Sequence, residues 1–256
     1  MLESIQPNIM TNIPSEKQSP RRFNFVRLWA IFLHPRQAFA EIASETRASW
    51  WTPMIVLSVM ALLSVIVSGY LNTRAAMMGE ISLPPDWQYW TPDMQNNYMQ
   101  AQQATQGPVF MYVIPLVGSL TSLWVGWIVL AGLLHLGSTL LGGRGSMQGA
   151  LNIAGWAGLP FAVRDILRIV YMLSASHAIT SPGLSGFTTN VFLSQVLALT
   201  DIFLFWNIVL LTIGFSISDG LSRGKALVGI LVVLLLLISV QAGLGSLMAR
   251  VGGGAF

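Results

Sequence analysis

The sequence contains no cysteine and few charged residues for its length. Because none of its 256 residues is Cys, disulfides, Cys-ligated zinc and a thiol nucleophile are excluded. Charged residues make up 9% of the chain, whereas soluble domains carry about 25%. With 54% hydrophobic residues, the chain has too few polar side chains to cover its apolar surface. The composition therefore predicts an integral membrane protein, and the net charge of +3 is too small to indicate a nucleic-acid partner.

Motifs for catalysis and metal binding are also missing. The sequence has no His-Glu-x-x-His for zinc and no Gly-x-Ser-x-Gly elbow for a nucleophile. Its histidines, His34, His135 and His177, lie far apart in the chain, and an isolated His135 is typical of a hydrogen-bonded packing residue. The glycine-rich run at 140–149 lacks the Gly-Lys-Ser/Thr ending of a phosphate loop, so we interpret it as a tight cytosolic turn. We predict no enzyme and no catalytic, cofactor or metal site.

Five segments are apolar enough to predict transmembrane helices, each of which needs about 20 mostly apolar residues. They are 53–71, 109–136, 147–163, 197–217 and 226–247. The predicted fold class is an all-α membrane protein, in which a bundle of five transmembrane helices forms one domain over 50–250. Residues 1–22 are polar and interrupted by proline, and we predict a disordered cytosolic tail there.

Basic residues orient the predicted helices. Two of them, Arg74 and Arg250, fall on one side of the membrane. Nine fall on the other side, before the first span or in the loops: Lys17, Arg21, Arg22, Arg27, Arg36, Arg47, Arg144, Arg223 and Lys225. Under the positive-inside rule this asymmetry predicts a cytosolic N-terminus and an extracytosolic C-terminus. The composition favours a prokaryotic cell membrane as the location.

Residues 23–49 are too charged to span a membrane but carry apolar side chains at helical spacing. Pro35 divides them into two sets, and the sets are Phe25, Leu28, Trp29 and Phe32, followed by Phe39, Ile42 and Ala43. This pattern predicts two short amphipathic helices. They either lie in the cytosolic membrane interface or pack under the helix bundle, and the two placements are compatible.

The loop at 72–108 is long and rich in Gln and aromatic residues. The run Thr91-Pro92-Asp93 predicts the start of a short helix within it. We expect this segment to cap the bundle, and recognition of something outside the cell is the alternative.

Three charges, Arg164, Asp165 and Arg168, follow the third predicted span shortly after Pro160. Charges in the hydrocarbon core are costly, but 147–163 covers only about 25 Å at 1.5 Å per residue. We therefore expect Arg164 near the outer membrane boundary. Pro160 would kink the helix, and the chain after it would run along the outer interface.

Asp201, in the fourth predicted span, is expected at a similar depth and needs a partner. We hypothesise that it pairs with Arg164 or Arg168, while Asp165 either faces water or closes the network. Asn207, two turns deeper, would extend a polar path. This cluster either fixes how the third and fourth spans dock, which we favour, or holds an anionic lipid head group, or forms part of an ion or proton path.

Small residues recur at every fourth position of the third predicted span. They are Ala150, Ala154, Gly158 and Ala162. Small side chains at this spacing allow helices to approach closely in lipid. We interpret the row as a packing face, with the border of a pathway as the alternative.

The stretch SDGLSRGKA at 218–226 predicts a second cytosolic turn. Its charged residues are Asp219, Arg223 and Lys225. We interpret them as one solvated patch, and contact with a partner or with lipid phosphates is the alternative.

Three stretches in this order resemble the Yip1 domain family. They are LWAIFLHPRQAFAEIA, LLGGRGSMQGALNIAGWAGLP and DIFLFWNIVLLTIGFSISDGLSRGKAL, and the resemblance covers roughly 25–247. It implies a five-span integral membrane protein with a cytosolic N-terminus. Eukaryotic members of the family are non-enzymatic factors in vesicle traffic and membrane shaping, which bind small GTPases and one another.

Together these features predict a non-enzymatic polytopic protein of the Yip1 type that organises membrane or binds partner proteins. The expected partners are membrane lipids and either another membrane protein or a further copy of this chain. The alternative is a small transporter or channel with a polar path near Arg164, Asp201 and Asn207. A lipid-modifying enzyme is a weaker third hypothesis.

Overall fold

The computed structural model describes residues 25–45, 47–79, 83–84 and 86–253, which form helices and turns without a strand. The predicted all-α class is confirmed for this part of the chain, whereas the tail predicted at 1–22 lies outside it. The helices are α1 (Val26–Leu33), α2 (Pro35–Ser44), α3 (Trp51–Met77), η1 (Trp87–Tyr89), α4 (Pro92–Thr105), η2 (Val109–Val113), α5 (Ile114–Leu140), α6 (Met147–Ala157), α7 (Leu159–Ala175), η3 (Ser185–Phe187), α8 (Val191–Leu199), α9 (Ile202–Ser218) and α10 (Arg223–Gly253).

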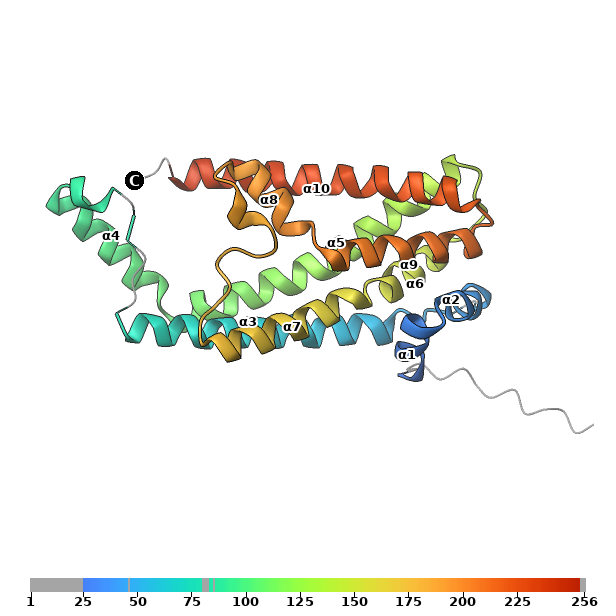
Figure 1. The fold of residues 1–256 in the computed structure, drawn as a ribbon, viewed down its shortest axis with the longest axis horizontal. Coiled ribbons are helices and arrows are strands. Elements are labelled where there is room, and N and C mark those ends of the chain that lie inside the picture. The colour runs from blue at the N-terminus through green and yellow to red at the C-terminus, as the bar shows by residue number, and fades with distance from the viewer. Residues whose placement is uncertain (1–24, 46, 80–82, 85, 254–256) are drawn as a thin grey trace, which may run out of the picture.

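The long helices α3, α5 and α10 run along the length of the molecule (Figure 1). Helix α7 packs on α3, while α8 and α9 pack on α10, and α5 contacts both α3 and α10. One end carries α1, α2 and the turns that follow α5 and α9, and α4 lies at the other end (Figure 1). We call the first of these the basic end, because its exposed cations are Arg36, Arg47, Arg144, Arg223 and Lys225. We call the other one the far end.

Several of the helices are built to cross a membrane. Trp51–Met77, Val109–Leu140 and Arg223–Met248 are each long and apolar enough to do so. Helices α8 and α9 would add a fourth span if they cross as one unit, although they are bent by 57° relative to each other. The predicted span at 147–163 is divided between α6, with 11 residues, and α7, with 17. The chain is therefore an integral membrane protein, and the count of five spans stays a prediction.

The division between α6 and α7 at Gly158 has a local cause. Pro160 has no N–H to donate, and the N–H of Phe161 donates to the carbonyl of Gly158 at 2.9 Å. Pro160 is one of the first residues of α7, a position at which its missing N–H costs little. The proline therefore lies at the start of a new helix, α7.

The course of the chain after Pro160 differs from the prediction. The segment does not turn along an outer interface, because α7 continues from Arg164 to Ala175, a further ~16 Å at 1.5 Å per residue. It packs on α3 along this length, and Met172 is buried. Arg164 therefore lies partway along the bundle and not at its outer boundary.

The core near the basic end joins α2, α6 and α9. Phe39 of α2 and Ile153 of α6 are fully buried, and both lie against Gly214 of α9. A Cβ atom at Gly214 would lie 2.5 Å from Ile153 Cγ2 and 3.2 Å from Phe39 Cδ1. Glycine is therefore required where α2 crosses under the bundle.

We expect Gly214→Ala to lower the free energy of unfolding by about 1–3 kcal/mol, the usual cost of overpacking a core. The matched control is Gly224→Ala, because a Cβ atom there would meet nothing within 4 Å. Unfolding of the two variants in mixed detergent micelles measures the difference. Equal stability of the two would contradict the packing of Phe39 on α9.

The loop predicted at 72–108 contains α4 at the far end (Figure 1). Thr91 caps this helix, because its hydroxyl accepts from the N–H of Met94 at 3.4 Å, as the Thr-Pro-Asp run predicts. Trp87 and Trp90 each contact Tyr98 edge to face, with ring centroids 5.5 and 5.6 Å from that of the tyrosine. This aromatic cluster holds the segment in shape, and its role as a cap or as a recognition element stays a prediction.

Candidate functional site

Asp201 sits at a break in the chain and not inside a continuous span. Helix α8 ends at Leu199 and α9 begins at Ile202, which corrects the span predicted at 197–217. The Asp201 carboxylate causes this start, since its Oδ1 accepts from the N–H of Leu204 at 2.9 Å. An aspartate in this capping position satisfies one of the free amides at a helix N-terminus. Asp201 therefore marks the bend between α8 and α9.

The same carboxylate is shared by two arginines of α7. Arg164 Nη1 lies 3.5 Å and Arg168 Nη2 lies 3.9 Å from Asp201 Oδ2. Arg164 Nε also donates to Asp165 Oδ1 at 3.4 Å, and the guanidinium lies over the ring of Phe161, 4.8 Å from its centroid. The structure therefore brings all four charges together, and we call Arg164, Asp165, Arg168 and Asp201 the charge cluster. It ties α7 to the start of α9.

Asn207 does not join the charge cluster. Its side chain is 2% exposed, and its Nδ2 donates to the carbonyl of Ala157 at 2.7 Å. That carbonyl lies just before the division between α6 and α7, so the amide satisfies a backbone group at the break. Leu204, Leu210 and Leu211 are buried around it on α9. The predicted polar path from Asp201 past Asn207 is therefore wrong, because Asn207 is enclosed in the apolar core.

The row of small residues lies inside the bundle. Ala150, Ala154 and Ala162 are buried, and a Cβ atom at Gly158 would lie 3.3 Å from Leu57 Cδ1 of α3. Ala154 and Ala162 belong to a cluster with Met54, Leu57, Trp127 and Ala131. The row thus lies against α3 and α5 and contributes packing.

Asp219 is separated from the cations that follow it in sequence. It is 5% exposed, and Ser138 Oγ of α5 donates to its Oδ2. The N–H of Arg144 donates to its carbonyl at 3.1 Å. A Cβ atom at Gly145 would collide with the carboxylate, which explains a glycine in this turn. The predicted patch of Asp219, Arg223 and Lys225 is therefore wrong, since only the two cations are exposed.

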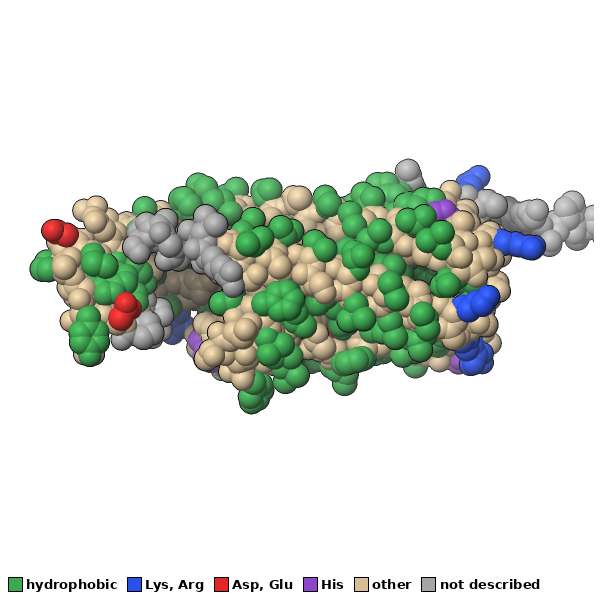
Figure 2. Space-filling model, turned by 90° about the horizontal axis from the view of Figure 1, so that it is seen from above, with side chains coloured by type: hydrophobic (Ala, Val, Ile, Leu, Met, Phe, Trp, Pro, Cys, Tyr) green, Lys and Arg blue, Asp and Glu red, His purple; other side chains and the backbone are tan. Residues whose placement is uncertain are grey.

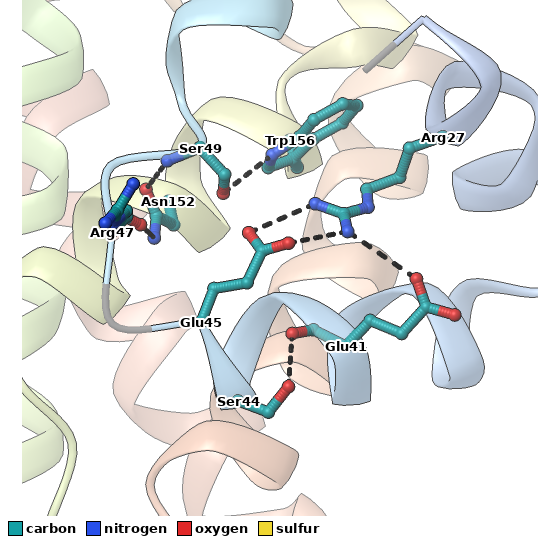
Figure 3. A network of polar contacts seen from close by, with 8 residues as sticks. All are labelled: Arg27, Glu41, Ser44, Glu45, Arg47, Ser49, Asn152 and Trp156. Carbon is teal, nitrogen blue, oxygen red and sulfur yellow. Dashed lines mark hydrogen bonds and ion pairs between the residues drawn. The ribbon is translucent and has the colours of Figure 1, made fainter. Parts of the chain in front are cut away.

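A second polar network joins α1 and α2 to α6 (Figure 3). It was not predicted from the sequence. Arg27 is 9% exposed, and its guanidinium donates to both carboxylate oxygens of Glu45, at 2.7 and 3.2 Å. Glu41 lies 3.6 Å away, and the ring of Trp156 lies 5.7 Å from the guanidinium carbon. This paired geometry is the strong form of an arginine–carboxylate contact.

The same network holds the link between α2 and α3. The N–H of Ser49 donates to Asn152 Oδ1 at 2.9 Å, and Asn152 Nδ2 donates to the carbonyl of Arg47 at 3.1 Å. Trp156 Nε1 donates to Ser49 Oγ at 3.3 Å. The partners are more than a hundred positions apart, so no local pattern reveals them. One local signal existed, because Arg27 lies one helical turn before the fully buried Ile31.

Helices α1 and α2, which we call the platform, present apolar side chains in two directions. Leu28 and Phe32 pack against the core with Ile31, and Phe39 and Ile42 are buried. Phe25 and Trp29, predicted to share the face of Leu28, are exposed instead. The remaining exposed apolar side chains of α1 are Val26 and Leu33. The platform therefore packs under the bundle and also leaves an apolar row uncovered.

Lys and Arg side chains gather at the basic end on the face seen in Figure 2.

No curated protein and no solved structure matches the chain. The model of one family, the Yip1 domain, matches residues 29–244. This range includes the platform from Trp29 onward, the charge cluster and the candidate membrane spans, of which only the last, Arg223–Met248, extends beyond the match. The chain belongs to the Yip1 domain family.

Proposed function

We propose that this protein is a non-enzymatic membrane scaffold that holds a second membrane protein, or a further copy of itself, against its bundle. The observation that carries the proposal is the open face of α5. Only 6% of the most apolar stretch of this span is buried, against 22% for each of the spans formed by α3 and α10. Because so little of this stretch is buried, it has room for a partner within the bilayer, although α5 also packs on α3, α6 and α10.

The open face of α5 also has the side chains that helix association in lipid requires. Gly118, Ser122 and Gly126 are exposed at every fourth position, and a Cβ atom at either glycine would meet nothing within 4 Å. Small residues at this spacing let a second helix approach closely, so that packing can drive association. The exposed valines Val117, Val125 and Val129 flank them on the same side.

The proposal includes the arrangement in the membrane. Five spans cross it, with α6 and α7 together forming the third and α8 with α9 the fourth. The basic end faces the cytosol, in agreement with the positive-inside rule, and the C-terminus lies outside. The platform lies in the cytosolic interface, across the direction of the long helices (Figure 1). Its buried Arg27 network holds it there.

Cross-linking through introduced cysteines tests the scaffold. Because the chain has no Cys, Ser122→Cys is a unique reactive site on the open face of α5. We expect it to give a cross-linked product of defined mass in native membranes. Leu235→Cys on α10, which is also exposed, is the matched control and should give much less. Equal yields from both positions would contradict a docking face on α5.

A transporter is the second candidate function, and one observation favours it. Two neighbouring segments, α6–α7 and α8–α9, are interrupted, and the charge cluster lies between them. Transporters place their substrates at such interrupted helices. The enclosed Asn207 argues against it, because the polar groups do not continue toward the basic end. Ion or solute flux into proteoliposomes that disappears in Asp201→Ala would favour transport over the scaffold.

A further inference from the structure

We propose that the basic end binds a leaflet rich in anionic lipid, with the exposed row of α1 among the acyl chains and the exposed cations of the same end on lipid phosphates. This inference rests on the proposed position of the platform in the cytosolic interface, and it adds the chemistry of the lipid. The occupant is a phosphodiester membrane surface and not a soluble protein.

The apolar row is large and its direction is fixed. Val26 is 81% exposed, Trp29 72% and Leu33 69%. The opposite side of α1 is held by Ile31 in the core and by Arg27, whose two bonds to Glu45 prevent the helix from turning over. Since α1 lies at the end of membrane-crossing helices (Figure 1), the lipid around those helices is the apolar phase that adjoins the row. Tryptophan is also enriched at the membrane–water interface.

The exposed charge at the basic end has one dominant sign among the residues that the structure describes. Among the described residues, five exposed cations of the basic end come from three separate regions: Arg36 and Arg47 near α2, Arg144 after α5, and Arg223 with Lys225 at the start of α10. Asp219, which would have offset two of them, is enclosed against Ser138. Glu41 is exposed but lies 3.6 Å from Arg27.

This arrangement suits an anionic surface better than an acidic protein. Apart from Arg36, these cations are close in sequence to the ends of α3, α5 and α10. Lipid head groups lie at those ends in the proposed arrangement, and a protein would have to displace them to reach the apolar row. Each Lys or Arg near an anionic leaflet strengthens the attraction by about fivefold. The row and the cations together combine the two signals that anchor a helix at an interface.

A single fluorescent probe tests the proposal in the full-length protein. Leu33→Cys is labelled with an environment-sensitive dye, and the protein is reconstituted into vesicles of phosphatidylcholine alone or of equal parts phosphatidylcholine and phosphatidylglycerol. Quenching by a nitroxide lipid and by aqueous iodide reports the depth of the dye. We expect phosphatidylglycerol to raise the ratio of lipid to iodide quenching several-fold. Asn96→Cys on the exposed surface of α4 is the probe control and should keep its ratio.

Variants that replace cations with neutral glutamine test whether the effect of phosphatidylglycerol depends on these charges. They thereby distinguish the proposed lipid from the proposed position of the platform. The variant Arg144→Gln with Arg223→Gln and Lys225→Gln should lose most of the rise, whereas Arg74→Gln at the far end should keep it. Equal quenching by the nitroxide lipid in both kinds of vesicle would overturn the proposed preference for an anionic leaflet. It would still agree with the proposed position of the platform in the interface. A dye that is quenched by iodide in both vesicles would overturn both. Protection from both quenchers would indicate a protein cover and also overturn the proposal.

Discussion

Asp201→Asn is expected to lower the free energy of unfolding by about 1–3 kcal/mol, since Arg164 and Arg168 then lose the carboxylate that lies between them. The amide still caps α9, because asparagine is as good a capping residue as aspartate. Asp201→Ala removes both functions and should cost about 1 kcal/mol more. Unfolding of the purified protein in mixed detergent micelles measures the two losses separately.

Asp93→Asn is the control for this series. Asp93 is exposed in the first turn of α4, so the same chemical change there should alter stability by less than about 0.5 kcal/mol. The variants also bear on the two candidate functions. If Asp201→Asn is as stable as the unchanged protein, the charge cluster does not tie α7 to α9. A loss of stability without loss of partner cross-linking would place the cluster in folding alone.

The pairing of Asp201 with arginine was predictable because an apolar stretch offers a charge few alternatives. Arg164 and Arg168 directly follow the neighbouring predicted span, and a poorly solvated carboxylate needs a partner of opposite charge. Their position along the bundle was not predictable in the same way. Proline can end a helix or begin one, and only the packing of α7 on α3 decides which occurs at Pro160.

The contacts of Asn207 and Asp219, in contrast, could not be predicted from the sequence. A polar residue in a span looks like part of a path, but the backbone carbonyl of Ala157 uses the Asn207 amide. Asp219 looks like a surface charge beside Arg223, but its carboxylate is buried and accepts a hydrogen bond from the hydroxyl of Ser138, 81 positions earlier in the chain. Both partners come from other helices, and hydropathy along one chain contains no information about them.

Glu45→Ala should have the largest effect at the platform, a loss of about 2–4 kcal/mol, because it leaves the guanidinium of Arg27 buried without its paired carboxylate. The loss arises because the buried guanidinium no longer has its paired carboxylate, and not because an ion pair in itself adds much stability. Replacing both residues, with Arg27→Met and Glu45→Ala, should therefore recover much of the loss, since a well-packed apolar side chain is often as stable as a buried ion pair. Unfolding of the single and double variants measures the coupling.

Glu41→Ala is the matched control, because it removes a carboxylate from the same guanidinium. The side chain of Glu41 is 67% exposed and its oxygen lies 3.6 Å from Arg27, so its removal should cost less than about 1 kcal/mol. The dye on Leu33→Cys gives a second measurement, since a loosened α1 changes its quenching. If Glu45→Ala and Glu41→Ala lose equal stability, Arg27 does not depend on its paired bonds to Glu45. The platform would then be held by the apolar packing of Ile31, Phe39 and Ile42 in the core, and the paired bonds of Arg27 would not fix the direction of the apolar row.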